Sequence, residues 1–241
     1  MLHIDAAKMH FKEINNCIRS AEEREIKITN CLGQRYICGG LSGREVLIEG
    51  TPGNALGSYL NGTSITVHGN AQDATGDTMN DGVITIHGSS GDATGYAMRG
   101  GEIYVSGSVG YRAGIHMKAY KEKLPVLVIG GTAGCFLGEY QAGGIIIVLG
   151  LGHENEAPVG DFCATGMHGG KIFVRGESLP EDISPQVLAN RAEKKDLEEI
   201  SPYIRRFCES FGADMDGIMS SGFLVLTPDT KNPYKQMYSH N

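Results

Sequence analysis

The chain has 241 residues, a formal net charge of −7 and an isoelectric point near 5.6. An acidic chain is a poor match for nucleic acid or for an anionic membrane, because both attract basic surfaces. The six cysteines include no CxxC pair and the amino terminus does not resemble a signal peptide, which predicts reduced thiols in a cytoplasmic protein. No apolar run approaches the roughly 20 residues of a membrane-spanning helix.

The first 30 residues predict a helix followed by a strand. Apolar side chains at Phe11, Ile14 and Ile18 recur at helical spacing, and Asp5 can cap the start of such a helix. The alternating run EIKI at 25–28 is typical of a strand with one buried face. We expect residues 1–30 to cover one end of the structure that follows, because an exposed strand edge invites association.

Between residues 31 and 176 the chain repeats itself every 19 residues. Columns of aliphatic residues recur at this spacing, for example Ile65, Ile84 and Ile103. So do two columns of glycines, namely Gly50, Gly69, Gly88 and Gly107, and Gly57, Gly76, Gly95 and Gly114. A fixed period of this length indicates a repeat architecture, and the alternation in runs such as VITIH at 83–87 predicts one strand in each repeat.

We therefore expect an all-β solenoid, namely a single-stranded parallel β-helix with coils of about 19 residues, flanked by short α-helices at both ends. In such a solenoid equivalent strands stack about 4.8 Å apart, so each column of like side chains becomes a ladder. Each coil must also turn sharply, which favours glycine at the turn. The predicted turn glycines are Gly57, Gly76, Gly95, Gly114, Gly138 and Gly166.

A basic segment interrupts the regular spacing between residues 111 and 123. The residues that distinguish it on an otherwise acidic chain are Tyr111, Arg112, Lys118, Lys121 and Lys123. Loops often carry binding contacts, so this segment is either a docking loop for a partner or an ordinary solvated loop. The sequence alone leaves both interpretations open.

Residues 177–241 predict two or three short helices and then a polar, extended tail. Ser184-Pro185 and Ser201-Pro202 each offer an N-cap followed by proline at the first helical position. An apolar stripe crosses the second of these starts and consists of Leu197, Ile200, Ile204, Phe207 and Phe211. This stripe needs a surface to cover, which is either the last coil or another subunit.

The residues do not predict a catalytic, cofactor-binding or metal-binding site on this chain. Asp73 and Asp92 would stack one coil apart, which could place a proton between two carboxylates. Each precedes an Ala-x-Gly turn, however, where a side chain that hydrogen-bonds its own backbone is favoured, so we assign both to turn stabilisation. His68 and His87 would also stack, and we interpret them as a solvated pair on the outer face.

The run GDATGDTMNDGVITIHGSSGDATGYAMRGGEIYVSG, continued by TAGCFLGEYQAGGIIIVLG, resembles the GXGXG repeat domain at the carboxyl end of the large glutamate synthase subunit. The segments GQRYICGGLSG and VGYRAGIHMKAY are similar to the free-standing version of this domain in archaea and some anaerobic bacteria. The resemblance implies a right-handed parallel β-helix with a structural role. It also implies that the glutaminase cysteine, FMN and the iron–sulfur clusters belong to other domains or chains.

The expected partners are thus the glutaminase subunit and the flavin- and iron–sulfur-containing subunits of a glutamate synthase. A related repeat occurs in a β-helical subunit of formylmethanofuran dehydrogenase, which provides a second interpretation. A third is a stand-alone carbohydrate-active enzyme that uses Asp73 and Asp92. An isolated subunit could also bury its docking face in a homo-oligomer, whereas nucleic acid and membranes are not expected partners.

Overall fold

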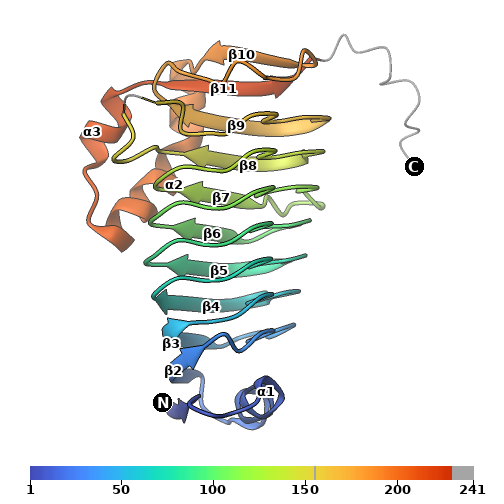
Figure 1. Cartoon of the computed structure of the whole chain (residues 1–241), viewed down its shortest axis with the longest axis vertical. Helices are drawn as coiled ribbons and strands as arrows, with labels where there is room; N and C mark the ends of the chain where they lie inside the picture. Colours follow the sequence, from blue (N-terminus) through green and yellow to red (C-terminus); the bar gives the residue numbers. More distant parts are fainter. Residues whose placement is uncertain (155, 230–241) are drawn as a thin grey trace.

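The structure of the chain is a computed structural model, which describes residues 1–154 and 156–229. Eleven strands form one sheet in the order β1-β2-β3-β4-β5-β6-β7-β8-β9-β11-β10, stacked along the long axis of the molecule (Figure 1). The strands are β1 (Leu2–Asp5), β2 (Glu25–Leu32), β3 (Glu45–Thr51), β4 (Asn61–His68), β5 (Asp81–Ile86), β6 (Glu102–Val105), β7 (Val126–Ile129), β8 (Ala142–Val148), β9 (Gly169–Arg175), β10 (Val187–Arg191) and β11 (Phe223–Pro228). The helices are α1 (Phe11–Ser20), α2 (Lys194–Phe211) and α3 (Met215–Ser220).

The predicted 19-residue spacing sets the register of the central strands. Val46 pairs with Ile65, Ile65 with Ile84, and Ile84 with Ile103, all in parallel ladders. Each side chain of a strand therefore lies above the equivalent side chain of the strand before it, and alternate side chains of a strand share one face of the sheet. The step lengthens between β6 and β7, where Ile103 pairs with Leu127, because the chain leaves the layer to form an inserted loop.

One hydrophobic core fills the space between the sheet and the segments that return from each strand to the next. Inner-face residues such as Ile84 and Ile86 are fully buried there, together with Met79 and Met98 from the return segments. Repeated burial of such side chains is the main source of stability in a stacked structure, since each layer covers the apolar surface of its neighbours.

A second core forms where α2 and α3 cover the opposite face of the sheet beside its upper strands (Figure 1). Ile204 and Phe207 of α2 are buried there against Tyr104, Val128 and other side chains of β6–β9. Ion pairs also hold α2 against the sheet. They join Lys171 Nζ to Asp196 Oδ1 at 2.9 Å and Arg206 to Glu102. The apolar stripe predicted in this region thus covers the sheet of its own chain.

The expected all-β solenoid, a right-handed parallel β-helix flanked by short helices, is wrong. The strand pairing is that of a single open sheet with free edges at β1 and β10, accompanied by an 18-residue helix, α2, in an arrangement of the α/β type. The return segments add no further sheet among the described residues and make isolated bridges, such as Ser90 with Val109. Every second residue in the turns of these segments has a positive φ. A strand ladder needs extended backbone throughout, so the turns cannot form a second sheet.

The carboxyl-terminal region also differs from the predicted pair of helix starts. The segment after Pro185 forms strand β10, which pairs antiparallel with β11, and Pro202 lies inside α2. At the amino-terminal end α1 begins at Phe11 with His10 as its N-cap, while Asp5 belongs to β1. The part of the predicted tail beyond residue 229 lies outside the described residues.

Candidate functional site

The return segment of each repeat contains a six-residue turn, and these turns stack along one side of the molecule. Within a turn every second residue has a positive φ, as in Ala74 (57°), Gly76 (71°) and Thr78 (53°). Backbone hydrogen bonds join equivalent turns, for example from Ala74 N–H to Asp92 O at 2.8 Å. We call this surface the turn face, and its turns span residues 54–59, 73–78, 92–97, 111–116, 135–140 and 161–166.

Five of the six predicted turn glycines occupy the middle positive-φ position of a turn, with φ between 62° and 73°; they are Gly57, Gly76, Gly95, Gly114 and Gly138. A Cβ on Gly76 would lie 2.3 Å from Cδ1 of Ile103, so glycine lets the turn approach the sheet closely. In the last turn Ala164 makes the equivalent backbone hydrogen bond. Gly166 lies two residues further along and also has a positive φ, 66°.

The turn face exposes two columns of aromatic rings. In the first column Tyr111, Phe136 and Phe162 come from successive turns, with ring centroids 5.2 and 4.9 Å apart. In the second column His116 stacks on Tyr140 at 5.3 Å. Tyr140 is 46% exposed and Phe162 is 45% exposed. Stacked aromatic side chains that remain in contact with water are typical of binding surfaces, where such residues are enriched.

The predicted docking residues are divided between the turn face and the inserted loop after it. The turn contains Tyr111 and Arg112, and the inserted loop contains Lys118, Lys121 and Lys123. Arg112 Nε lies 3.1 Å from a Glu139 carboxylate oxygen, and Lys123 Nζ lies 2.9 Å from an Asp81 oxygen. These pairs neutralise part of the basic charge and hold both segments against the stacked layers, so the inserted loop is attached to the molecule rather than freely projecting.

The two predicted turn aspartates bond to the backbone of the next turn. Asp92 N–H donates to Asp73 Oδ1 at 3.0 Å, and Tyr111 N–H donates to Asp92 Oδ1 at 2.8 Å. Each carboxylate is therefore an acceptor for a backbone amide one layer further along the stack. The aspartates thus join successive layers, whereas the turn pattern predicts a bond to the backbone of the aspartate's own turn.

Replacing Asp92 with alanine is expected to lower the free energy of unfolding by about 1–2 kcal/mol, because the Tyr111 amide loses its acceptor. Asp92→Asn is expected to retain most of the stability, since the amide oxygen of asparagine can accept the same hydrogen bond. Urea denaturation of the two variants beside the wild type measures the difference. Equal losses in both variants would contradict the assigned hydrogen bond.

The histidine pair lies on the outer face beside the carboxyl end of α2. The rings of His68 and His87 meet edge to face with centroids 4.7 Å apart, and Phe211 contacts His87 in the same way at 5.1 Å. Burial, followed by the proximity of His68, lowers the pKa of His87. His87 is thus a packing contact of α2, which the repeat pattern alone did not indicate.

The described residues contain no group of three or more His, Cys, Asp or Glu side chains placed to hold a metal ion. Cys38 and Cys163 are fully buried, and burial raises the pKa of each thiol to about 12. Both side chains therefore pack as protonated, small apolar groups. The helices of the described chain are too short or too polar to span a membrane.

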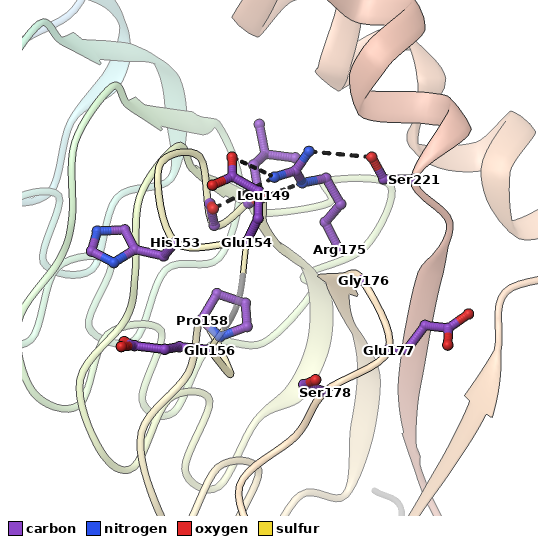
Figure 2. Close-up of a pocket in the computed structure, with 11 residues that line it drawn as sticks. Leu149, His153, Glu154, Glu156, Pro158, Arg175, Gly176, Glu177, Ser178 and Ser221 are labelled. Atoms are coloured by element: carbon purple, nitrogen blue, oxygen red, sulfur yellow. Dashed lines mark hydrogen bonds and ion pairs between the residues drawn. The ribbon is translucent and has the colours of Figure 1, made fainter.

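Sequence analysis did not single out Arg175, which lies in the wall of a pocket of about 330 Å³ beside the loop that begins at Gly150 (Figure 2). Its guanidinium donates to the carbonyl oxygens of Leu149 and Gly150 and to Ser221 Oγ, and it pairs with Glu154 at 3.5 Å. These contacts tie the loop and the end of α3 to β9. We therefore assign Arg175 a structural role.

Comparisons with known proteins agree with the repeat pattern. Over 249 aligned residues the chain is 45% identical to an uncharacterized protein of Methanocaldococcus jannaschii, covering 98% of this chain and 95% of that protein. The fold of the present chain is similar to that of a chain in the crystal structure of the formyltransferase/hydrolase complex (FhcABCD) from Methylorubrum extorquens in complex with methylofuran. The two chains have a TM-score of 0.66 and 17% sequence identity, and the match covers 96% of the present chain and 92% of the other. Residues 4–226 match the model of the GXGXG motif family. The chain therefore belongs to the GXGXG motif family.

Proposed function

We propose that this chain is a structural subunit, without catalytic activity of its own, of a multi-subunit glutamate synthase that serves nitrogen assimilation. The observation that carries the proposal is the family match over residues 4–226, because the glutamate synthase large subunit contains this repeat at its carboxyl end. In this role the chain holds a glutaminase subunit in position relative to a subunit that carries FMN and iron–sulfur clusters.

The turn face supports a role in assembly. Aromatic side chains combined with an arginine are the composition of energetically important interface positions. Arg112 lies 5.3 Å from the ring centroids of both Tyr111 and Phe136, so these groups form one continuous patch. The turns below this patch are joined by backbone hydrogen bonds, and a rigid surface loses little conformational freedom when a partner binds.

A second candidate is a structural subunit of a formylmethanofuran dehydrogenase-like complex. The fold likeness to a chain of the formyltransferase/hydrolase complex, over 96% of this chain, favours it. The two candidates predict different partners, namely a glutaminase and a flavin protein in the first case and the other subunits of a formyl-transferring or molybdenum- or tungsten-containing enzyme in the second.

Affinity purification of the tagged chain from its native host, followed by mass spectrometry and a visible spectrum, tests the proposal. We expect a glutaminase subunit and a yellow-brown flavin and iron–sulfur protein to be recovered. Recovery of formyl-transferring, molybdenum or tungsten enzyme subunits would favour the second candidate. A colourless oligomer of this chain alone would contradict both.

The same purification tests the turn face directly. Phe162→Asp combined with Tyr140→Asp is expected to reduce partner recovery at least tenfold, because it places two charges in the aromatic patch. Aspartate tolerates the positive φ of both positions, so the fold should be retained. Leu188→Asp, on an exposed residue of edge strand β10, is the matched control and is expected to leave recovery unchanged.

A further inference from the structure

A groove lies on the lower part of the turn face, between α1 and the inserted loop after residue 117. It consists of two adjoining pockets of about 650 and 390 Å³ that share Gly40 and Tyr59 in their walls. The first pocket lies against α1 and includes Lys12, and the second lies against the inserted loop and includes Tyr120. Both boundaries are elements that the 19-residue repeat does not itself supply. The groove is thus an addition to the repeat.

The groove is positively charged although the chain as a whole has a net charge of −7. Its walls contain four basic side chains and one acidic side chain, namely Lys12, Arg19, Arg99, Lys123 and Asp77. Arg19 donates to the backbone oxygen of Gly39, and Lys123 pairs with Asp81. Within the described parts of the chain, Lys12 and Arg99 form no ion pair with a carboxylate. These two cations can therefore pair with acidic groups of a ligand.

Aromatic rings line the groove between these charges. Tyr59 is 59% exposed and Tyr120 is 52% exposed, while Phe11 and Tyr36 pack together with their centroids 5.8 Å apart. The Arg35 guanidinium lies 5.5 Å from the Phe11 ring. Tyrosine and arginine side chains along a groove suit an extended polypeptide, because rings contact its side chains and backbone while cations bind its carboxylates.

Both walls of the groove are held in place by hydrogen bonds. Asn15 of α1 donates to Tyr36 O at 3.0 Å and accepts from Cys38 N–H at 3.0 Å, which fixes the helix to the first layers. On the other side Tyr120 and Lys123 close the inserted loop by bonding to each other through their backbones at 3.0 and 3.1 Å. The ion pair from Lys123 Nζ to Asp81, at 2.9 Å, holds this loop to β5. The groove therefore exists before a ligand arrives, which lowers the entropic cost of binding.

We propose that this groove binds an acidic, extended polypeptide segment of a partner subunit. The inference rests on the proposed structural role, since it names the chemistry of the segment through which a partner is held. Carboxylates of the segment pair with Lys12 and Arg99, and its apolar or aromatic side chains pack on Tyr59 and Tyr36. The acidic character follows from charge complementarity with the basic walls.

Fluorescence anisotropy with the full chain tests the groove directly. The probe is a labelled ten-residue peptide in which glutamate alternates with tyrosine, and the reference is the same peptide with lysine in place of glutamate. We expect the glutamate peptide to bind at least tenfold more tightly and to weaken as salt is raised. Lys12→Glu combined with Arg99→Glu is expected to weaken it a further tenfold or more. Lys194→Glu combined with Arg205→Glu, on exposed residues of α2, has the same change in charge and is expected to have no such effect.

Equal binding of the two peptides, or equal binding by the groove variant and its α2 control, would overturn the proposal. Displacement of the peptide by an equal concentration of oligouridylate would show a nucleic-acid site instead, and displacement by millimolar inorganic phosphate would show a site for small anions.

Affinity purification separates this result from the proposed function. If the groove variant recovers all partner subunits, the groove is wrong and the structural role stands. If the wild type recovers none, the structural role is wrong whatever the peptide does.

Discussion

Gly69→Ala is expected to lower the melting temperature by roughly 6–12 °C, corresponding to a loss of about 3 kcal/mol in the free energy of unfolding. Gly69 has a φ of 151°, and a Cβ there would lie 2.2 Å from the backbone oxygen of Gly50 in the preceding layer. The obstructing atom belongs to backbone that is held by the stack, so it cannot rotate away as a side chain could. Thermal unfolding followed by circular dichroism measures the change.

Gly62→Ala is the matched control, because Gly62 also has a positive φ, 91°, but a Cβ there would meet nothing within 4 Å. Its expected cost is about 1 kcal/mol, from backbone strain alone. The difference between the two variants therefore reports the contact between layers. If both variants melted at the same temperature, the close approach of Gly69 to Gly50 would not make substitution at Gly69 more costly than at Gly62.

Phe207→Ala is expected to destabilise the protein by about 3–5 kcal/mol, because it leaves a cavity between α2 and the sheet. Phe207 is 1% exposed, and its ring packs on Phe211 with the centroids 4.7 Å apart. Its Cζ also lies so close to Gly130 that a Cβ there would be only 2.7 Å away. Chemical denaturation gives the free energy, and hydrogen exchange shows whether the amides of α2 lose protection.

Phe211→Ala is the control for this prediction, since the Phe211 ring lies at the end of α2 and is only partly buried. It is expected to cost about 1–2 kcal/mol. If Phe207→Ala had no greater effect than Phe211→Ala, the packing of α2 on β6–β9 would contribute little to stability. The helix would then require another partner to hold it.

The repeat period predicted the pairing of the central strands but not the overall closure of the fold. Periodic columns such as Ile65, Ile84 and Ile103 indicate which side chains stack, and these residues are paired in the structure. Whether the return segments also form ladders depends on their backbone conformation. The positive φ of non-glycine residues such as Ala74 and Thr78 is not evident from residue type. The expected β-helix required each coil to close on itself, whereas the structure has one open sheet with turns packed along one side of it.

The carboxyl-terminal region shows how local signals yield to tertiary contacts. Ser201-Pro202 predicts a helix start, yet α2 begins at Lys194 and accommodates Pro202 in its interior. An internal proline removes one backbone hydrogen bond, and burial of Ile200, Ile204 and Phe207 against the sheet offsets this cost. Local sequence preferences do not include that contribution, because the covering surface comes from strands far away in the sequence.

The exposed aromatic columns were only partly predictable. The predicted docking segment includes Tyr111 but not Phe136, Phe162 or Tyr140, because insertions shift these three residues out of the 19-residue register. These residues fall into columns when the turns are aligned by the glycine or alanine at their middle position instead of by a constant period. The repeat places Asn61, Asn80 and Arg99 in one column of the groove, but it does not indicate that α1, which carries Lys12, lies beside that column.

The sequence by itself determined that the central strands are parallel, in register and 19 residues apart, because a constant period places like apolar side chains where stacking buries them together. Only the tertiary structure decided that the sheet stays open, that its direction reverses at β11, and that α2 covers its outer face. It also decided which aromatic and basic side chains meet on the turn face. These features depend on contacts between segments that share no periodicity, and no local pattern encodes such contacts.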